Sequence, residues 1–271
     1  MPITRSGRLR AGVVAACLLA TIAFVPAESL AAAAVVGHGP IKLVTPPGRV
    51  ASTSTNWAGF SAFERHTSFS SVRGRWVQPT ATCNSNHDQW ASFWIGIDGY
   101  NSNTVEQIGT DSDCRDSSAP GGTPTYYAWF EMYPAPPHTI GGVPIHPGDQ
   151  IVTRISASNH RFSLVLTNAT TGKSFQTREK LVTAEQSSAE WIAEAPSGCN
   201  GQSCKVLPLA NFGSVDFTGS YTTGDGHQGS ISDPAWKHDR ITMAASQTVV
   251  KAATSPLNAT GTEFSVDWQH V

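Results

Sequence analysis

Residues 151–180, IVTRISASNHRFSLVLTNATTGKSFQTREK, decide the fold class. Ile151–Ser156 and Arg161–Leu166 are short runs of β-branched and apolar residues, and Ser174–Lys180 follows them after a second turn. In the middle run apolar side chains recur at every second position, as on a strand with one buried face. Asn and Gly residues between the runs are typical of tight turns. The stretch therefore predicts an antiparallel meander.

The chain from Asn56 onward has the same character. Short runs rich in Val, Ile, Thr and aromatic residues alternate with Gly, Pro, Asn and Ser clusters, and no long stretch has a helical period. The 271 residues include 8 Trp, 11 Phe and 5 Tyr, and only 14% are charged, 18 basic against 20 acidic. This composition predicts an all-β sandwich or barrel and excludes a coiled coil or a disordered chain. No basic stripe is present that would bind nucleic acid.

The N-terminus has the pattern of an export signal. Three arginines precede an apolar run of 15 residues, Ala11–Val25, which is too short to span a bilayer. Small residues then lead to Ala31, so we expect a signal peptide over residues 1–31; an uncleaved anchor helix is the alternative. Residues 32–50 are rich in Ala, Gly and Pro without a period, and we expect a linker or short pro-segment. Residues 51–271 would form a single β-sandwich domain, secreted and free of the membrane.

The cysteines indicate two disulfides. Removal of the signal deletes Cys17 and leaves four cysteines, an even number in an exported chain. Cys199 and Cys204 enclose a four-residue loop and are expected to pair, which leaves Cys83 with Cys114. A zinc site is the alternative, but the chain has no CxxC motif and no suitably spaced His, so we predict no metal.

Two expected strands carry large aromatic residues around an acid on one face. In Trp90–Asp98, Phe93, Ile95 and Ile97 form an apolar face, and Trp94 and Asp98 lie on the other. In Tyr126–Tyr133, one face carries Tyr127, Trp129, Glu131 and Tyr133. Aromatic side chains with interleaved acids favour a concave ligand surface. The alternative is that loops cover this second face and make it part of the core.

Two further strands add polar groups. Val105–Gly109 contains Gln107, and Ala189–Ala195 contains Glu190 and Glu194, which share a face. The sequence lacks the motifs of serine hydrolases, zinc peptidases, pepsin-like sites and phosphate-binding loops.

Five short stretches resemble the glutamic peptidases, also called eqolisins, and occur in that family's order. They are Ser54–Gly59, Trp94–Gly99, Gln107–Gly109, Tyr126–Pro134 and Ala189–Glu194. The Cys199/Cys204 loop follows at a similar place.

The resemblance implies a bent sandwich of two antiparallel sheets, concanavalin-like or jelly-roll-like, with an active site on the concave face. It also implies endopeptidase activity on polypeptides at acid pH, with no metal and no cofactor. We expect the protein to be a monomer. By motif, Glu194 is the general base and Gln107 its electrophilic partner. The residues that would bind substrate or orient this pair are Trp94, Asp98, Tyr127, Trp129 and Glu131.

Two features depart from the family pattern. Tyr127 stands where the fungal members have an acid, and Ala195-Pro196 replaces an acid-aromatic pair, so a substrate preference does not carry over. The stretch before Asn56 is short, so we expect no inhibition by a folded propeptide. A glycoside hydrolase using Glu131 and Glu194 is one alternative function, and a non-catalytic carbohydrate-binding sandwich is another.

Overall fold

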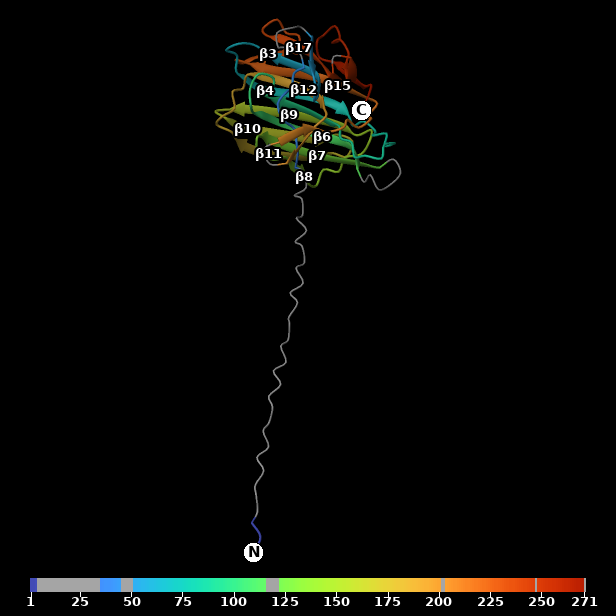
Figure 1. Cartoon of the computed structure of the whole chain (residues 1–271). Helices are drawn as coiled ribbons and strands as arrows, with labels where there is room; N and C mark the ends of the chain where they lie inside the picture. Colours follow the sequence, from blue (N-terminus) through green and yellow to red (C-terminus); the bar gives the residue numbers. More distant parts are fainter. Residues whose placement is uncertain (4–34, 45–50, 116–121, 201–202, 247, 271) are drawn as a thin grey trace. The chain divides into compact units, whose positions relative to one another are not determined.

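The computed structural model describes residues 1–3, 35–44, 51–115, 122–200, 203–246 and 248–270 (Figure 1). The predicted signal peptide lies outside these ranges apart from its first three residues. Every regular element in the described ranges is a β-strand, which confirms the all-β prediction. The strands are β1 (Val35–Gly37), β2 (Ala51–Ser54), β3 (Trp57–Phe63), β4 (Phe69–Val77), β5 (Ser92–Ile97), β6 (Val105–Arg115), β7 (Thr123–Tyr133), β8 (His138–Ile140), β9 (Gln150–Ser158), β10 (Arg161–Asn168), β11 (Lys173–Lys180), β12 (Ser188–Glu194), β13 (Ser197–Asn200), β14 (Ser203–Val206), β15 (Ser214–Gly224), β16 (His227–Ser230), β17 (Lys237–Ser246), β18 (Val249–Thr254) and β19 (Phe264–Trp268).

Most strands belong to one hydrogen-bonded sheet that folds into two layers. Its order is β11-β10-β9-β4-β15-β19-β18-β17-β3-β12-β5-β6-β7-β8. The long strand β15 joins the layers, because Ser214–Phe217 pairs with β19 and the part from Thr218 onward pairs with β4. A small second sheet, β1-β13-β14, stands beside it.

The expected meander is present as β9, β10 and β11. The two pairings are antiparallel, and the strands run a few residues beyond their predicted ends. Phe162, Leu164 and Leu166 on β10 are buried, as their alternation indicates. The first turn places Asn159 and His160 at positive φ, which Asn tolerates better than most residues.

The main core lies between the two layers. Indole N–H groups cross it to reach the opposite layer: Trp76 donates to the Thr110 hydroxyl at 3.0 Å, and Trp191 donates to the Arg73 carbonyl at 2.8 Å. Buried indole donors need such partners, since an unpaired N–H inside the protein is costly. Phe93 and Ile95 on β5 join the same core, so the other face of β5 points away from it.

Two disulfides, Cys83–Cys114 and Cys199–Cys204, are formed as predicted. The first ties β6 to the loop after β4, and the second closes the β13–β14 hairpin. No helix within the described ranges is long and apolar enough to cross a membrane.

Candidate active site

The face of β5, β6, β7 and β12 that points away from the interlayer core carries most of the predicted site residues; we call it the site face. A second apolar cluster covers it and includes Trp57, Trp94, Trp129 and Ile192. The alternation of aromatic residues in the sequence therefore corresponds to a second sheet face, separate from the interlayer core. The predicted residues on the site face are Trp94, Gln107, Tyr127, Trp129, Glu131 and Glu194.

Glu194 ends β12 and is fully buried. The Trp94 indole N–H donates to Glu194 Oε2 at 2.8 Å. Burial raises the pKa of Glu194 to about 8, against the lowering effects of the Trp94 hydrogen bond and the nearby charge of Lys42. The carboxyl therefore retains its proton to near neutral pH while the site is covered.

Gln107 and Glu131 lie directly opposite each other on β6 and β7. The Gln107 side-chain amide donates to Glu131 Oε2 at 3.2 Å, which orients the amide with its NH₂ group toward the carboxyl. Burial raises the pKa of Glu131 to about 9, and the charges of Glu194 and Asp111 add to this rise.

The chain before β2 lies across this site. Gln107 Nε2 donates to the backbone carbonyl of His38, and the His38 backbone N–H donates to Glu131 Oε2 at 2.8 Å. The His38 ring stacks on Trp129 with centroids 3.6 Å apart, and its Nδ1 lies 3.3 Å from Glu194 Oε2. Burial lowers the pKa of His38 to about 4, so the docked ring is neutral at neutral pH.

An acidic network borders the site on the same face. The Tyr127 hydroxyl is 2.7 Å from Asp111 Oδ2 and 3.1 Å from Asp113 Oδ2, and the Trp129 indole N–H donates to Asp111 Oδ1 at 2.6 Å. Burial raises the pKa of both aspartates, and the charge of Asp111 raises that of Asp113 further. These hydrogen bonds to Asp111 and Asp113 thus fix the positions of the Tyr127 and Trp129 rings on the site face.

Asp98 and Glu190 serve other parts of the site face. Asp98 accepts backbone N–H bonds from Glu185, Gln186 and Ser187 at 2.8–2.9 Å, so it fixes the loop before β12. Glu190 is buried and accepts from the Ser61 hydroxyl at 3.1 Å. Neither carboxyl hydrogen-bonds to Gln107 or Glu194. Asp98 was predicted to bind substrate or to orient this pair, and it can orient the pair only indirectly, by fixing the loop before β12.

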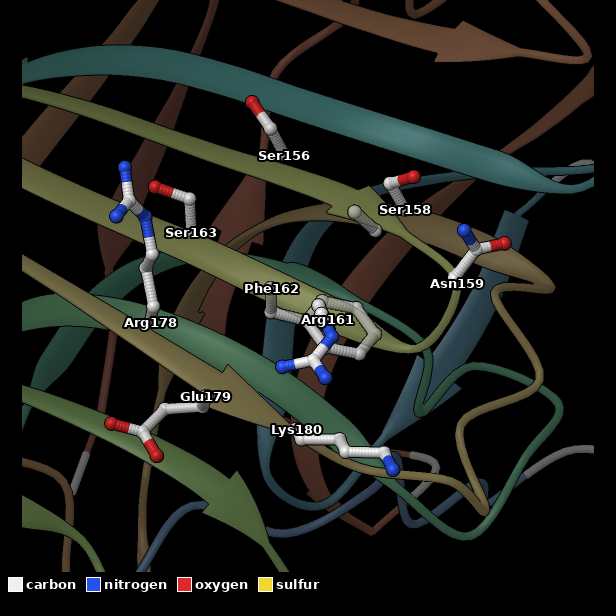
Figure 2. A pocket seen from close by; sticks show the side chains of 10 residues that line it. Ser156, Ser158, Asn159, Arg161, Phe162, Ser163, Arg178, Glu179 and Lys180 are labelled. Atoms are coloured by element: carbon white, nitrogen blue, oxygen red, sulfur yellow. The ribbon is translucent and has the colours of Figure 1, made fainter.

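Two pockets differ in what lines them. One of about 490 Å³ opens beside His38 and is also lined by Tyr127, Trp129 and Thr139. The other, shown in Figure 2, lies over β9, β10 and β11 and is lined by serine and basic side chains, including Arg178. It contains none of the predicted site residues, whereas the first pocket is an open continuation of the site.

Sequence reasoning missed His38, Asp111 and Asp113. The aspartates have the same odd-numbered alternation as Gln107, and extending the predicted strand beyond Gly109 would have placed them on the site face. His38 lies in a stretch without a period, and its partner Glu131 is 93 residues away. No local pattern signals such a contact.

Three solved structures resemble this chain. Scytalido-glutamic peptidase with a transition state analog inhibitor is 25% identical, with a TM-score of 0.65 over 79% of this chain and 98% of that chain. SCP-B, an eqolisin in complex with the tripeptide Ala-Ile-His, is 26% identical with a TM-score of 0.64 over the same shares. Aspergilloglutamic peptidase from Aspergillus niger is 29% identical, with a TM-score of 0.54 over 67% of this chain and 99% of that chain. No curated protein sequence matches.

The fold and these likenesses define a glutamic-type peptidase. Residues 55–266 match the model of the peptidase A4 family, and the chain belongs to that family. The predicted family is therefore confirmed. The comparisons do not favour a glycoside hydrolase or a carbohydrate-binding module.

Proposed function

We propose that this peptidase hydrolyses polypeptides at acid pH outside the cell, with Glu194 as general base and Gln107 as oxyanion donor. The observation that carries the assignment is the contact of Gln107 Nε2 with the backbone carbonyl of His38, a residue whose ring Nδ1 lies 3.3 Å from Glu194 Oε2. An extended peptide on the site face thus meets an amide donor and a carboxyl at one residue. Peptide hydrolysis needs both groups at such a position.

Glu194 would act in its ionised form. It takes a proton from a water molecule as that water attacks the scissile carbonyl, then gives the proton to the departing amine. The Trp94 hydrogen bond favours the ionised form and holds the carboxyl in place. Access of solvent to an uncovered site reduces the burial effect, so the pKa of Glu194 falls toward its ordinary value.

Gln107 would stabilise the negative charge that develops on the scissile oxygen. An amide keeps its N–H donors at every pH, so it suits acid conditions. Glu131 accepts from the same Nε2 and fixes which end of the amide faces the substrate. The charge of Glu194 raises the pKa of Glu131, so the two carboxyls do not readily ionise together. The Trp94 N–H favours the ionised form of Glu194, which leaves Glu194 as the base and Glu131 as the neutral group. In the uncovered site both pKa values fall toward the ordinary range of a carboxyl, and activity should lie between the two apparent pKa values of the pair there, in acid.

A glycoside hydrolase would use Glu131 and Glu194 and would give Gln107 no chemical role. The hydrogen bond from Gln107 to a backbone carbonyl favours the peptidase instead. Secretion is supported by the predicted signal and by the two disulfides, which persist in oxidising compartments.

Two substitutions test the mechanism on an external peptide. Glu194→Gln keeps the shape but removes the base, so cleavage should fall to background at every pH. Gln107→Ala removes the oxyanion donor, and kcat should fall by ~10²–10³-fold with a smaller change in KM. The double variant should be little worse than Glu194→Gln, because the residues act as a unit.

Glu263→Gln, on an exposed side chain, is the matched control and should keep full activity. Proteolysis within threefold of the unmodified enzyme after Gln107→Ala, with the fold intact by circular dichroism, would exclude this mechanism. A loss of polysaccharide hydrolysis in Glu131→Gln and Glu194→Gln, with Gln107→Ala unaffected, would point to the glycosidase.

A further inference from the structure

Basic side chains gather on the face of β4, β9, β10 and β11 that points away from the interlayer core; we call it the basic face. Val72, Ile155 and Leu164 on these strands belong to the core, so the residues between them point outward. The outward basic residues come from three separate stretches of the sequence, and all are exposed: Arg73, Arg75, Arg154, Arg161, Arg178 and Lys180.

The strand register places like charges directly opposite each other on this face. Arg73 on β4 pairs with Arg154 on β9, and Arg161 on β10 pairs with Lys180 on β11. Like charges at directly opposite positions destabilise a sheet. Within the described ranges, no ion pair joins any of the six basic residues to an acidic side chain. The fold therefore retains an electrostatic cost that an anionic ligand would remove.

Neutral partners hold two of these arginines in place. The Arg73 guanidinium lies over the Tyr221 ring, 4.6 Å from its centroid, and Arg154 Nε donates to the Ser156 hydroxyl at 3.2 Å. A pocket of about 270 Å³ is lined by Arg73, Arg75 and Arg154. Three guanidinium groups thus converge on one hollow of the basic face without a carboxylate to neutralise them.

The pocket of about 480 Å³ in Figure 2 continues this face over β9, β10 and β11. Cations and hydroxyl groups line it together: Arg161, Arg178, Lys180, Ser156, Ser158 and Ser163. Glu179 also lines the pocket, but its carboxyl accepts from the Thr177 hydroxyl at 2.6 Å. The basic face therefore carries two hollows, each with cations, and hydroxyl groups lie between those cations.

We propose that the basic face binds a linear anionic polysaccharide. Neighbouring strands lie ~4.8 Å apart and alternate residues of one strand lie ~7 Å apart, so the cations form a row of regularly spaced sites. Guanidinium groups match the paired oxygens of carboxylate, sulfate and phosphate groups. The serine hydroxyls both donate and accept, which suits the hydroxyl groups of the sugar rings between the acid groups.

The composition of the face favours this polymer over single-stranded nucleic acid and over a membrane. The aromatic side chains of β4, β9, β10 and β11 all belong to the core or pack against it, so none is available for bases to stack on. Of the large apolar side chains that are exposed in the described ranges, Val77 at the end of β4 is the one that lies on these strands. Interfacial binding to lipid needs a larger apolar surface than this.

The basic face and the site face belong to different layers and point away from the core in opposite directions. The site face is carried by β5, β6, β7 and β12, and none of these strands contributes a residue to the basic face. A polymer bound to the basic face therefore leaves the site face uncovered. Such binding would hold the domain on an anionic matrix, and it does not depend on the mechanism proposed for Glu194 and Gln107.

The test measures binding of the purified chain at pH 6 by titration calorimetry. Dextran sulfate and polygalacturonate are the anionic polysaccharides, and neutral dextran is the control ligand. At least one anionic polymer should bind, and the tighter of the two identifies sulfate or carboxylate as the preferred acid group. Its affinity should fall ~10- to 100-fold between about 50 and 200 mM salt, because bound counterions are released. Neutral dextran should not bind.

Two double variants each remove one like-charge pair: Arg73→Gln with Arg154→Gln, and Arg161→Gln with Lys180→Gln. Each should lower the affinity ~3- to 30-fold, since an exposed ion pair contributes a modest free energy. The matched control, Lys205→Gln with Lys237→Gln, removes two exposed charges on β14 and β17. It should bind within about twofold of the unmodified chain. Circular dichroism and thermal melting would verify that all three variants fold.

Three results would overturn the proposal. In the first, neither anionic polysaccharide binds. In the second, the control variant loses as much affinity as the two variants of the basic face, so that only the net charge matters. In the third, a single-stranded DNA oligonucleotide or vesicles containing phosphatidylserine bind more tightly than both polymers, which would make nucleic acid or an anionic membrane the ligand of this face.

Discussion

Glu194 lies between two opposing influences on its pKa. Burial favours the neutral carboxyl, whereas the Trp94 N–H and the charge of Lys42 favour the carboxylate. Residues 35–44 lie across the site and bring both the burial and the Lys42 charge, whereas the Trp94 N–H lies on β5 and acts whether or not these residues cover the site. Trp94 thus determines how readily Glu194, the proposed base, ionises once the site is open to solvent, in addition to lining the site.

Trp94→Phe should therefore shift the pH profile as well as lower the rate. The variant keeps an aromatic ring but removes the donor to Glu194 Oε2, so the pKa of Glu194 rises. Since Glu194, as the proposed base, acts in its ionised form, the acid limb of kcat/KM should move to higher pH. Profiles of kcat/KM measured from pH 2 to 7 on an external peptide would show this.

Trp236→Phe is the matched control, because Trp236 donates to the Ser230 and Ile231 carbonyls in another part of the fold. Its acid limb should coincide with that of the unmodified enzyme. An unshifted limb in Trp94→Phe, with kcat merely reduced, would mean that the indole N–H does not tune the base.

The strands β5 and β6 make room for the site through two glycines. A Cβ on Gly109 would lie 2.3 Å from the Phe93 carbonyl oxygen, so the close approach of the strands requires glycine there. A Cβ on Gly96 would lie 2.8 Å from Trp94 Cζ3. The Trp94 ring thus lies over Gly96, with its N–H directed at Glu194. These glycines belong to the stretches by which the sequence resembles its family.

Gly96→Ala should impair activity more than folding. The added methyl group displaces the rigid Trp94 ring, which shifts its N–H away from Glu194 Oε2. A loss of one charge-assisted hydrogen bond corresponds to about 1.5–3 kcal/mol, or ~10- to 100-fold in kcat/KM. Steady-state kinetics beside thermal melting would separate the two effects.

Gly141→Ala is the control for that substitution, since a Cβ there meets nothing within 4 Å. It should leave both kinetics and melting unchanged. If Gly96→Ala lowered the melting temperature steeply but not kcat/KM of the folded fraction, Gly96 would have a packing role only.

Alternation along single strands predicted most of the site face but not what covers it. Trp129 and Glu131 on β7, and Gln107 on β6, follow directly from period two, because successive side chains of a strand point to opposite faces. Asp98 shares a predicted face with Trp94, yet its carboxylate turns to the loop before β12, because Asp98 follows the end of β5 and has a positive φ. The approach of His38 depends on contacts that are distant in the sequence.

Buried carboxyls give the whole domain an unusual dependence on pH. Burial raises the pKa of Glu106 to about 10, in addition to the values of Glu131 and Glu194, and it raises those of Glu190, Asp111 and Asp113. In the unfolded chain such groups titrate near 4. Between pH 4 and these raised pKa values, the folded state therefore binds protons more tightly than the unfolded state.

Stability should accordingly be greatest in acid and should fall as the pH rises from about 4.5 to 9. A group with a raised folded pKa contributes stability below its unfolded pKa, and this contribution is lost as the pH rises through the folded value. His38 acts in the opposite sense between its unfolded pKa and about 4, but six carboxyls outweigh one imidazole. Calorimetry should give a melting temperature at pH 4.5 well above that at pH 8.

Glu106→Gln should flatten this dependence, because an amide does not titrate. With one unit of pKa equal to about 1.4 kcal/mol, and about 2–4 °C of melting temperature per kcal/mol in a domain of this size, the variant should recover several degrees at pH 8. Glu263→Gln should leave the curve unchanged because its side chain is exposed. A melting temperature that rises from pH 4.5 to 8 would show that these buried carboxyls do not set the acid stability of the fold. The same would follow if the melting temperatures of Glu106→Gln and Glu263→Gln fell equally over this pH range.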